Sequence, residues 1–340
     1  MVTLTDVQSS NAQIATALPP GLVAVFVGAT NGIGETSLRE FARHANQPRV
    51  YFVGRSQEAG DRIAAECHEL NPEGEFTFIK ADVSLLKSVD EVCREITRKE
   101  KCINLVFLTC GSALSHVDTS EGLHIFMALA YYARARFILN LLPLLRQAPS
   151  LRRVVTVLAA GHEGPIYADD FQSRNVPLRH VRGHNVSMTD LMLEHMASLA
   201  PEVSFIHDYP GPVKSGFGRE TNSVLMKVAI TIFKIVGPLV YIPLRESGER
   251  HLFFATSARY PPRSGSEAAG VPVSGDVVVS GGTSGDVGSG VYAVNWDGES
   301  AGAKSLQVLA KMRGEGMVAR LWQDTMAEFK RVTGVESLAK

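Results

Sequence analysis

The chain has 340 residues, 45% of them apolar and 20% charged, and its formal net charge is −1 at pH 7. This length and apolar fraction predict a single α/β domain with a C-terminal extension, and the balanced charge argues against a nucleic-acid-binding protein. The first basic residue is Arg39, which argues against a secretory or transit peptide. The spacing of the four cysteines forms no metal-binding pattern, which favours a reducing, cytoplasmic setting. They are Cys67, Cys93, Cys102 and Cys110.

The first predicted strand, at 21–28, is apolar and runs directly into a glycine-rich turn followed by a helix from 35 to 44. Gly28, Gly32 and Gly34 allow the backbone to turn tightly and to approach a pyrophosphate group at the start of that helix. A glycine triplet alone is weak evidence, but the strand before it and the helix after it are the expected context. An ordinary glycine-rich turn is the alternative.

Strands and helices then alternate along the chain. The pattern predicts strands at 50–53, 75–80, 103–109, 154–158 and 203–207, and helices at 57–70, 85–100, 121–147 and 187–200. Such alternation implies right-handed crossovers and a Rossmann-type, doubly wound parallel sheet.

Residues 225–244, within the predicted lid segment 221–244, are the one stretch that could be mistaken for a membrane span. Lys227, Lys234, Pro238 and Pro243 interrupt it, and its polar residues recur at helical spacing. The pattern favours an amphipathic helix that would form a lid on the binding site of a small apolar organic substrate. Peripheral membrane contact through 223–243 and the face of a homodimer are the alternatives.

The C-terminal part is predicted to extend the domain. Residues 261–290 are rich in glycine and serine and predict an irregular loop, and 291–335 should supply the last strand and a helix from about 303 to 333. The sequence thus divides into a nucleotide-binding domain at 20–260, the loop and this extension.

These features together resemble the short-chain dehydrogenase/reductase family. The loop Gly28–Gly34 is similar to the family's Thr-Gly-x-x-x-Gly-x-Gly turn, with Val27 in place of the threonine. Asp82 is similar to the family's adenine-binding aspartate, and Pro210–Ser215 is similar to the Pro-Gly-x-Val-x-Thr loop on the nicotinamide side.

The resemblance implies a nicotinamide cofactor, and Arg55 favours NADP(H). An NAD-binding member would normally carry an acidic residue at the end of the second strand, whereas Arg55 can pair with a 2′-phosphate. A solvated surface arginine is the alternative. The implied cofactor-binding residues are Gly28, Thr30, Asn31, Gly32, Ile33, Gly34, Arg55, Asp82, Gly111, Pro210, Gly211, Val213 and Ser215.

The family's Ser-Tyr-Lys-Asn relay is missing from this chain. The serine position holds Ala159, the tyrosine and lysine positions hold Gly183 and Ser187, and the helix asparagine falls near Tyr132. The absence of the lysine does not depend on the alignment, because no lysine lies between Lys101 and Lys214.

Five polar residues in this interval are candidates to act in place of the relay. His162 and His207 follow or end strands and are expected at the cofactor edge of the sheet, and His184 is expected at the start of a helix. Tyr167 and Ser187 complete the set. The alternative is that each histidine is an ordinary loop or cap residue. No spacing predicts a metal site.

Three functions remain open. The first is an NADP(H)-dependent oxidoreductase that reduces an activated C=N, C=C or C=O bond in a small apolar substrate. The second is a non-redox cyclase or isomerase that uses positioning and electrostatics. The third is an inactive nucleotide-binding pseudoenzyme. The order of these motifs along the chain also resembles that of short-chain dehydrogenase/reductase family members found in fungal secondary-metabolite pathways.

Overall fold

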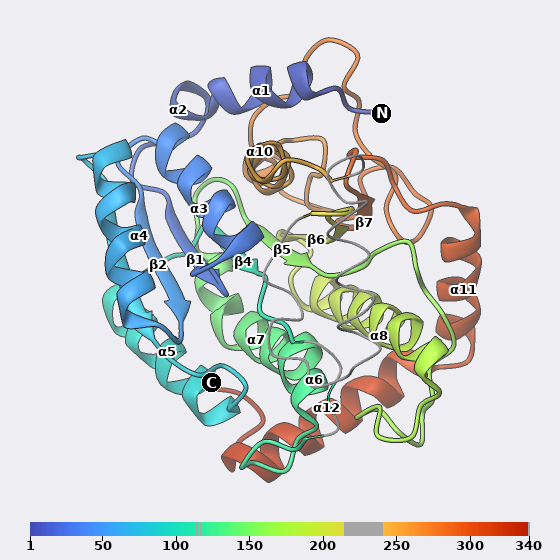
Figure 1. Ribbon diagram of the computed structural model, residues 1–340. Helices are drawn as coiled ribbons and strands as arrows, with labels where there is room; N and C mark the ends of the chain where they lie inside the picture. Colours follow the sequence, from blue (N-terminus) through green and yellow to red (C-terminus); the bar gives the residue numbers. More distant parts are fainter. Residues whose placement is uncertain (113–114, 116, 214–240, 339–340) are drawn as a thin grey trace.

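A seven-stranded sheet forms the centre of the molecule (Figure 1). The computed structural model describes residues 1–112, 115, 117–213 and 241–338. Every neighbouring strand pair is parallel, in the order β3-β2-β1-β4-β5-β6-β7. The strands are β1 (Val23–Val27), β2 (Arg49–Gly54), β3 (Glu75–Lys80), β4 (Leu105–Leu108), β5 (Arg153–Val157), β6 (Ser204–Tyr209) and β7 (Val291–Asn295). The predicted Rossmann-type, doubly wound sheet is confirmed.

The strands are apolar on both faces because both faces are covered by helices. Strand β1 is buried at all five positions, with Val25 in one core and Phe26 in the other. Phe26 lies level with Phe52 of β2 and Phe107 of β4 in the strand register. The order of the strands reverses between β1 and β4, so their carboxyl ends form the edge at which such sheets bind ligands.

Two layers of helices enclose the sheet (Figure 1). One layer contains α1 (Leu4–Ala12), α2 (Ile14–Ala17), α3 (Gly32–His44), α4 (Gln57–Leu70) and α10 (Leu244–Thr256). The other contains α5 (Leu86–Lys99), α6 (Ile125–Met127), the π-helical turn η1 (Ala128–Tyr132), α7 (Ala133–Arg146), α8 (Leu178–Leu199), α11 (Ala303–Gly314) and α12 (Met317–Thr333).

Two fully buried arginines fasten the ends of β5. At the amino end, the Arg153 guanidinium donates to the carbonyl oxygens of Phe254 and Ala269 at 2.7 and 2.8 Å. At the carboxyl end, Arg134 donates to the carbonyl oxygens of Val157 at 2.9 Å and Cys110 at 2.5 Å. Burial lowers the pKa of both groups, and the carbonyl acceptors compensate the lost hydration.

Three predicted helices differ from the observed ones. Helix α8 begins at Leu178, nine residues before the expected start at 187, because Pro177 precedes it with a φ of −53° that suits a helix start. The expected helix 121–147 contains the π-helical turn before α7. The expected helix 303–333 is two helices, separated at Gly316, whose φ is +72°.

The structure also shows elements that the sequence pattern did not predict. Helix α1 packs against α10, where Asn11 Nδ2 donates to the carbonyl oxygen of Glu249 at 2.9 Å. A short 3-10 helix, η3 (Ser266–Ala268), lies in the otherwise irregular loop. The predicted lid helix falls mostly on 214–240, outside the described residues.

One helical stretch, Ile125–Arg146, is long and apolar enough to cross a membrane by length and composition. However, 78% of its most apolar window is buried inside the molecule. It therefore packs as a core helix of the domain.

Candidate functional site

The turn after β1 brings the backbone close to the neighbouring strand. Gly28 has a φ of +84°, and a Cβ atom there would lie 2.7 Å from the Cys110 nitrogen. A Cβ atom on Gly34 would lie 2.5 Å from Thr109 Oγ1, which donates to the carbonyl oxygens of Val27 and Gly28. Both positions therefore exclude a side chain.

This turn leaves the start of α3 open for an anion. The N-cap residue Asn31 makes no hydrogen bond to the first turn with its side chain. Gly32, Ile33 and Thr30 surround the same turn and are only partly buried. Free N–H groups and the positive end of a helix are what a pyrophosphate requires, so the loop fits a dinucleotide.

The end of β2 lies against this turn. A Cβ atom on Gly54 would meet Thr30 Cγ2 at 2.3 Å, so the strand end and the turn touch. The next residue, Arg55, is exposed beside them. This is the placement expected for a group that contacts the ribose of a bound nucleotide.

The remaining predicted cofactor residues lie after β3, β4 and β6. The Asp82 carboxylate accepts hydrogen bonds from Ser84 N and Oγ at 3.0 and 2.8 Å. Gly111 has open space where its side chain would be. Four of the predicted cofactor residues follow β6: Pro210, Gly211, Val213 and Ser215. Val213 forms a β-bridge with Ile242, and Ser215 lies outside the described residues.

Gly183 and Ser187, which the sequence analysis placed at the tyrosine and lysine positions, form a contact between α8 and the loop after β5. A Cβ atom on Gly183 would lie 2.8 Å from the Gly164 Cα atom, and Gly164 N donates to the Gly183 carbonyl oxygen at 3.1 Å. Ser187 Oγ donates to Gly164 O at 2.8 Å and accepts from Gly164 N at 3.0 Å. Ser187 is fully buried, so this candidate fixes the loop.

The sequence pattern predicted His184 at the start of a helix. This prediction is wrong, because α8 begins six residues earlier. His184 is fully buried, and its Nδ1 accepts the Tyr167 backbone N–H at 3.0 Å. Burial lowers the pKa of His184 to about 4, so its ring is neutral at pH 7. It holds the loop rather than facing solvent.

Tyr167 pairs with a histidine that the sequence analysis did not select. Its hydroxyl group lies within hydrogen-bonding distance of His180 Nδ1, and His180 Nε2 accepts from Arg179 Nε at 3.2 Å. Since Nε2 is an acceptor, the proton of a neutral His180 sits on Nδ1 and points at the tyrosine oxygen.

His162 lies at the carboxyl edge of the sheet, as predicted. It is exposed, its Nδ1 is 3.3 Å from the Ala159 carbonyl oxygen, and its ring meets the Tyr209 ring edge-on at 4.9 Å between centroids. The Arg182 guanidinium lies over the same Tyr209 ring at 5.2 Å. Sequence reasoning missed Arg182 and Tyr209, although Tyr209 directly precedes the Pro210–Gly211 step.

The sequence analysis expected His207 at the cofactor edge of the sheet. The structure instead buries it within β6, with its side chain turned toward α8. Its Nδ1 lies 2.7 Å from Asp190 Oδ1, and its Nε2 accepts the Ala159 N–H at 3.3 Å. Burial lowers the pKa of His207 to about 4. Burial also raises the pKa of Asp190 well above its usual range, and the nearby Glu163 carboxyl raises it further. The sequence analysis missed Asp190 and Glu163.

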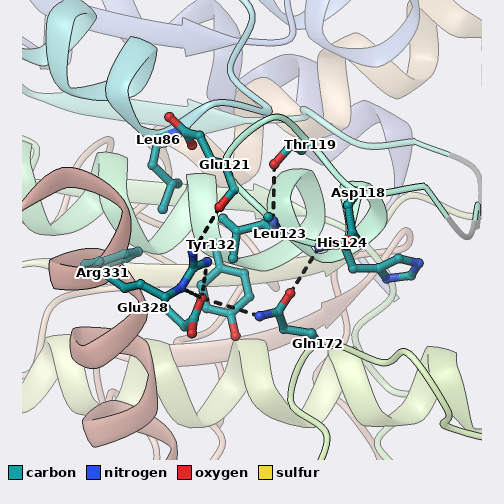
Figure 2. A network of polar contacts seen from close by, with 12 residues as sticks. Leu86, Asp118, Thr119, Glu121, Leu123, His124, Tyr132, Gln172, Glu328 and Arg331 are labelled. Carbon is teal, nitrogen blue, oxygen red and sulfur yellow. Dashed lines mark hydrogen bonds and ion pairs between the residues drawn. The ribbon is translucent and has the colours of Figure 1, made fainter.

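Tyr132, which the sequence analysis placed near the family's asparagine, is fully buried and contacts α12. Burial raises the pKa of the Tyr132 hydroxyl group, which donates to Asp324 of α12 at 3.4 Å. Tyr132 is one member of a polar network that connects α12 to the loops before α6 and α8 (Figure 2). It therefore contributes to the attachment of α12.

The same network holds the start of α5. The Glu121 carboxylate accepts the backbone N–H groups of Leu86 and Lys87 at 2.6 and 3.1 Å (Figure 2). The Glu121 carbonyl oxygen accepts from Arg331 at 3.0 Å, and Gln172 bridges Glu328 and the His124 backbone. Four separate segments are thereby fixed to one another beside the site.

Other kinds of site are less well supported by the described residues. Within them, no three His, Cys, Asp or Glu side chains are placed to hold a metal ion. A hollow of about 390 Å³ lies between α8, α11 and β7, and its lining includes Glu194, Arg313 and Thr283. This hollow adjoins the amino end of β7, away from the carboxyl edge.

Comparison with known proteins agrees with the fold. The short chain dehydrogenase family model matches residues 22–128. An oxidoreductase of Emericella nidulans is 41% identical over 331 residues, which cover 96% of this chain and 97% of the relative. A short-chain dehydrogenase/reductase of Stachybotrys chartarum is 30% identical and covers 91% of this chain and 92% of its own length.

Solved structures show the same fold at low sequence identity. The L-sorbose reductase of Gluconobacter frateurii, complexed with NADPH and L-sorbose, has a TM-score of 0.54 and 15% identity, and the match covers 76% of this chain and 97% of the reductase. An alcohol dehydrogenase of Thermococcus sibiricus, complexed with 5-hydroxy-NADP, has a TM-score of 0.52 and 19% identity over 68% of this chain and 89% of its own. The chain is an oxidoreductase that belongs to the short-chain dehydrogenase/reductase family.

Proposed function

We propose that the protein is an NADP(H)-dependent reductase that acts on an activated C=N, C=C or C=O bond of a small apolar molecule without a tyrosine–lysine relay. One observation carries this proposal. The backbone of Gly164 occupies the space into which a side chain at Gly183 would project. A tuned tyrosine cannot stand there, so the substrate must need less help with its proton than an ordinary ketone does.

The cofactor part of the proposal rests on the turn after β1. Gly28, Gly32 and Gly34 would let the backbone approach the pyrophosphate at the start of α3, and Arg55 would pair with the 2′-phosphate. When bound, the cofactor supplies a hydride. A solved relative of the same fold, the sorbose reductase, is complexed with NADPH, which supports the choice of cofactor.

The substrate part rests on three side chains at the carboxyl ends of β5 and β6. Arg182 and His162 both contact the Tyr209 ring, which orients them toward the same edge. Within the described part of the chain, the Arg182 guanidinium has no carboxylate partner. Its charge can therefore stabilise negative charge that develops on the reacting group.

A binding and turnover experiment tests this function. We expect calorimetry to show tighter binding of NADPH than of NADH. With NADPH, the protein should reduce a cyclic N-alkyl iminium salt faster than acetophenone by on the order of 10²–10⁴-fold, because only the ketone needs an accompanying proton. Brisk reduction of acetophenone would contradict the proposal.

A non-redox isomerase or cyclase is the second candidate. The cation and imidazole beside Tyr209 could polarise a substrate without any hydride transfer. In that case a product forms while the NADPH absorbance stays constant. The same experiment therefore separates the two functions.

A further inference from the structure

The turn after β5 presents His162 at the carboxyl edge of the sheet. His162 is exposed, whereas His184 and His207, the other two histidines selected from the sequence, are fully buried. Its ring packs edge-on against Tyr209, which the Arg182 guanidinium also contacts. Of these three histidines, His162 is therefore the one that a substrate at this edge can reach.

Two backbone carbonyl groups fix the proton on one side of the His162 ring. Its Nδ1 lies 3.3 Å from both the Ala159 and the Ala160 carbonyl oxygens. A carbonyl oxygen can only accept a hydrogen bond, so Nδ1 carries a proton and shares it between the two oxygens. Within the described residues, the other ring nitrogen, Nε2, has no hydrogen-bonding partner. The proton that the ring exchanges is therefore held on Nε2.

The turn that carries His162 is fixed on both sides. On the strand side, His207 Nε2 accepts the Ala159 N–H at 3.3 Å. On the helix side, Ser187 Oγ donates to the Gly164 carbonyl oxygen and accepts the Gly164 N–H. Because the chain is held before and after His162, its ring is in place before a ligand binds, as an acid-base group requires.

The charged and titratable groups around His162 suit proton donation. His162 and Arg182 lie 4.9 and 5.2 Å from the centroid of the same Tyr209 ring, so a cation stands beside the imidazole. The neighbouring carboxyl group, Glu163, is 9% exposed and accepts the Gly161 N–H at 2.8 Å, so it is engaged within the turn. Arg182 can stabilise negative charge on a substrate oxygen, and His162 can neutralise that charge with a proton.

We propose that His162 is the catalytic acid of carbonyl reduction and that it donates the proton on Nε2 to the substrate oxygen. The inference rests on the proposed reductase function, and it assigns the proton source that the absent tyrosine leaves open. An imidazole exchanges a proton near neutral pH without a neighbouring lysine, which agrees with the absence of the relay.

The step balances in protons and electrons. The carbonyl carbon gains a hydride from the cofactor, and the electron pair of the C=O bond moves to oxygen. That oxygen bonds to the proton of the His162 imidazolium, while the Nε2–H bond breaks and its electron pair stays on Nε2. The alcohol forms, and the neutral ring keeps its other proton on Nδ1 between the two carbonyl oxygens. Water can return the second proton, because the ring is exposed.

The first test locates the proton without any substrate or cofactor. Long-range proton–nitrogen NMR spectra of histidine-labelled protein, recorded above neutral pH, distinguish the two ring nitrogens of a neutral imidazole. The His162 signals, identified by their loss in His162→Asn, should show the proton on Nδ1. His68→Asn, at an exposed position of α4, is the control and should keep these signals. A neutral His162 ring with its proton on Nε2 would overturn the assignment of the acid.

The second test measures delivery of the proton. Asparagine at position 162 can keep an N–H group where Nδ1 meets the carbonyl oxygens but has no equivalent of Nε2, so a purely structural role would survive the change. We expect His162→Asn to slow NADPH-dependent reduction of phenanthrenequinone by on the order of 10²-fold. Reduction of the iminium salt should change by less than about twofold, because the iminium carbon needs no proton. The wild-type rate on the quinone should also fall above neutral pH, where the imidazolium is lost, while the rate on the iminium salt stays level.

The outcomes separate delivery from the reductase function. An equal loss on both probes, or no loss on the quinone, would refute delivery by His162 and leave the reductase function standing. Tyr209→Phe, which keeps the ring and removes the nearby hydroxyl group, should slow the quinone less than His162→Asn does; the reverse order would assign the proton to Tyr209. If the wild type reduces the iminium salt alone, only delivery fails. If it reduces neither probe, both fail, while the NMR spectra still decide where the proton is held.

Discussion

At the scale of single residues, Gly183 lies where no larger side chain fits without a change in the backbone around it. Gly164 lies against it, and a Cβ atom would come within 2.8 Å of the neighbouring Cα atom. The contact is between two backbones, so no side-chain rotation can relieve it. A larger side chain at Gly183 would therefore require the loop after β5 to move.

We expect the double change Gly183→Tyr with Ser187→Lys to destabilise the protein and not to restore ketone reduction. Overpacking a filled position typically costs about 1–3 kcal/mol, and here Ser187 also loses two hydrogen bonds to Gly164. Urea unfolding and an acetophenone assay provide the measurements. Gly302→Ala, where a Cβ atom meets nothing within 4 Å, is the control. Wild-type stability together with new ketone reductase activity would contradict this expectation.

Arg55→Ala should weaken binding of NADPH and leave binding of NADH unchanged. A charge-assisted contact to the 2′-phosphate contributes roughly 1.5–3 kcal/mol, or on the order of tenfold to a hundredfold in Kd. Calorimetry with both cofactors measures the difference, and Arg98→Ala on the exposed side of α5 is the control. Equal loss of affinity for both cofactors would show that Arg55 does not read the phosphate.

His184 should make the stability of the protein dependent on acid. Its folded pKa of about 4 is below the usual 6.5, so the native state binds fewer protons than the unfolded state between these values. The advantage of the wild type over His184→Gln should be complete above pH 6.5 and shrink by up to about 1.4 kcal/mol per pH unit below it. Parallel stability curves for the two proteins between pH 7 and pH 4 would rule this out.

At the scale of elements, the sequence predicts the strands well and the side-chain directions poorly. The order of apolar runs and glycine turns led to the observed sheet because the central strands, such as β1 and β5, are buried on both faces. For the same reason, nothing in the pattern tells which face His207 and Asp208 take. One pairs with α8 and the other with α10, so Asp190 and Glu163 could not be linked to His207 from the sequence.

The start of α8 shows a second limit. A helix at 187–200 follows from apolar spacing, but the first turns of α8 carry Arg179, His180 and Arg182, which give no apolar signal. The loop after β5 contacts these turns, for example through the Tyr167 hydroxyl group and His180. Tertiary contacts of this kind are not encoded in local periodicity.

Glu121 should be the residue on which the start of α5 depends (Figure 2). Its carboxylate accepts the Leu86 and Lys87 N–H groups, which lack a capping side chain from the helix itself. Loss of such a cap typically costs about 0.5–2 kcal/mol, so Glu121→Ala should lower the free energy of unfolding by that amount. Urea unfolding measures this free energy, and Glu69→Ala, at an exposed position of α4, is the control. An equal effect of the two changes would show that Glu121 does not cap the helix.

At the scale of the whole molecule, the candidate site residues come from distant stretches of the chain and meet at one edge of the sheet (Figure 1). The glycine turn follows β1, Ala159 follows β5, and Tyr209 ends β6. The topology therefore accounts for the common location, which the resemblance also implied.

The two arginines at the ends of β5 have a consequence for how the protein can move. Each guanidinium is held by several carbonyl oxygens from neighbouring segments, so β5 cannot slide or tilt without leaving a buried charge unsolvated. The sheet then behaves as a rigid frame, and adaptation to different ligands falls to the loops at its edge. Structures with and without a bound nucleotide should superimpose closely over β4, β5 and β6.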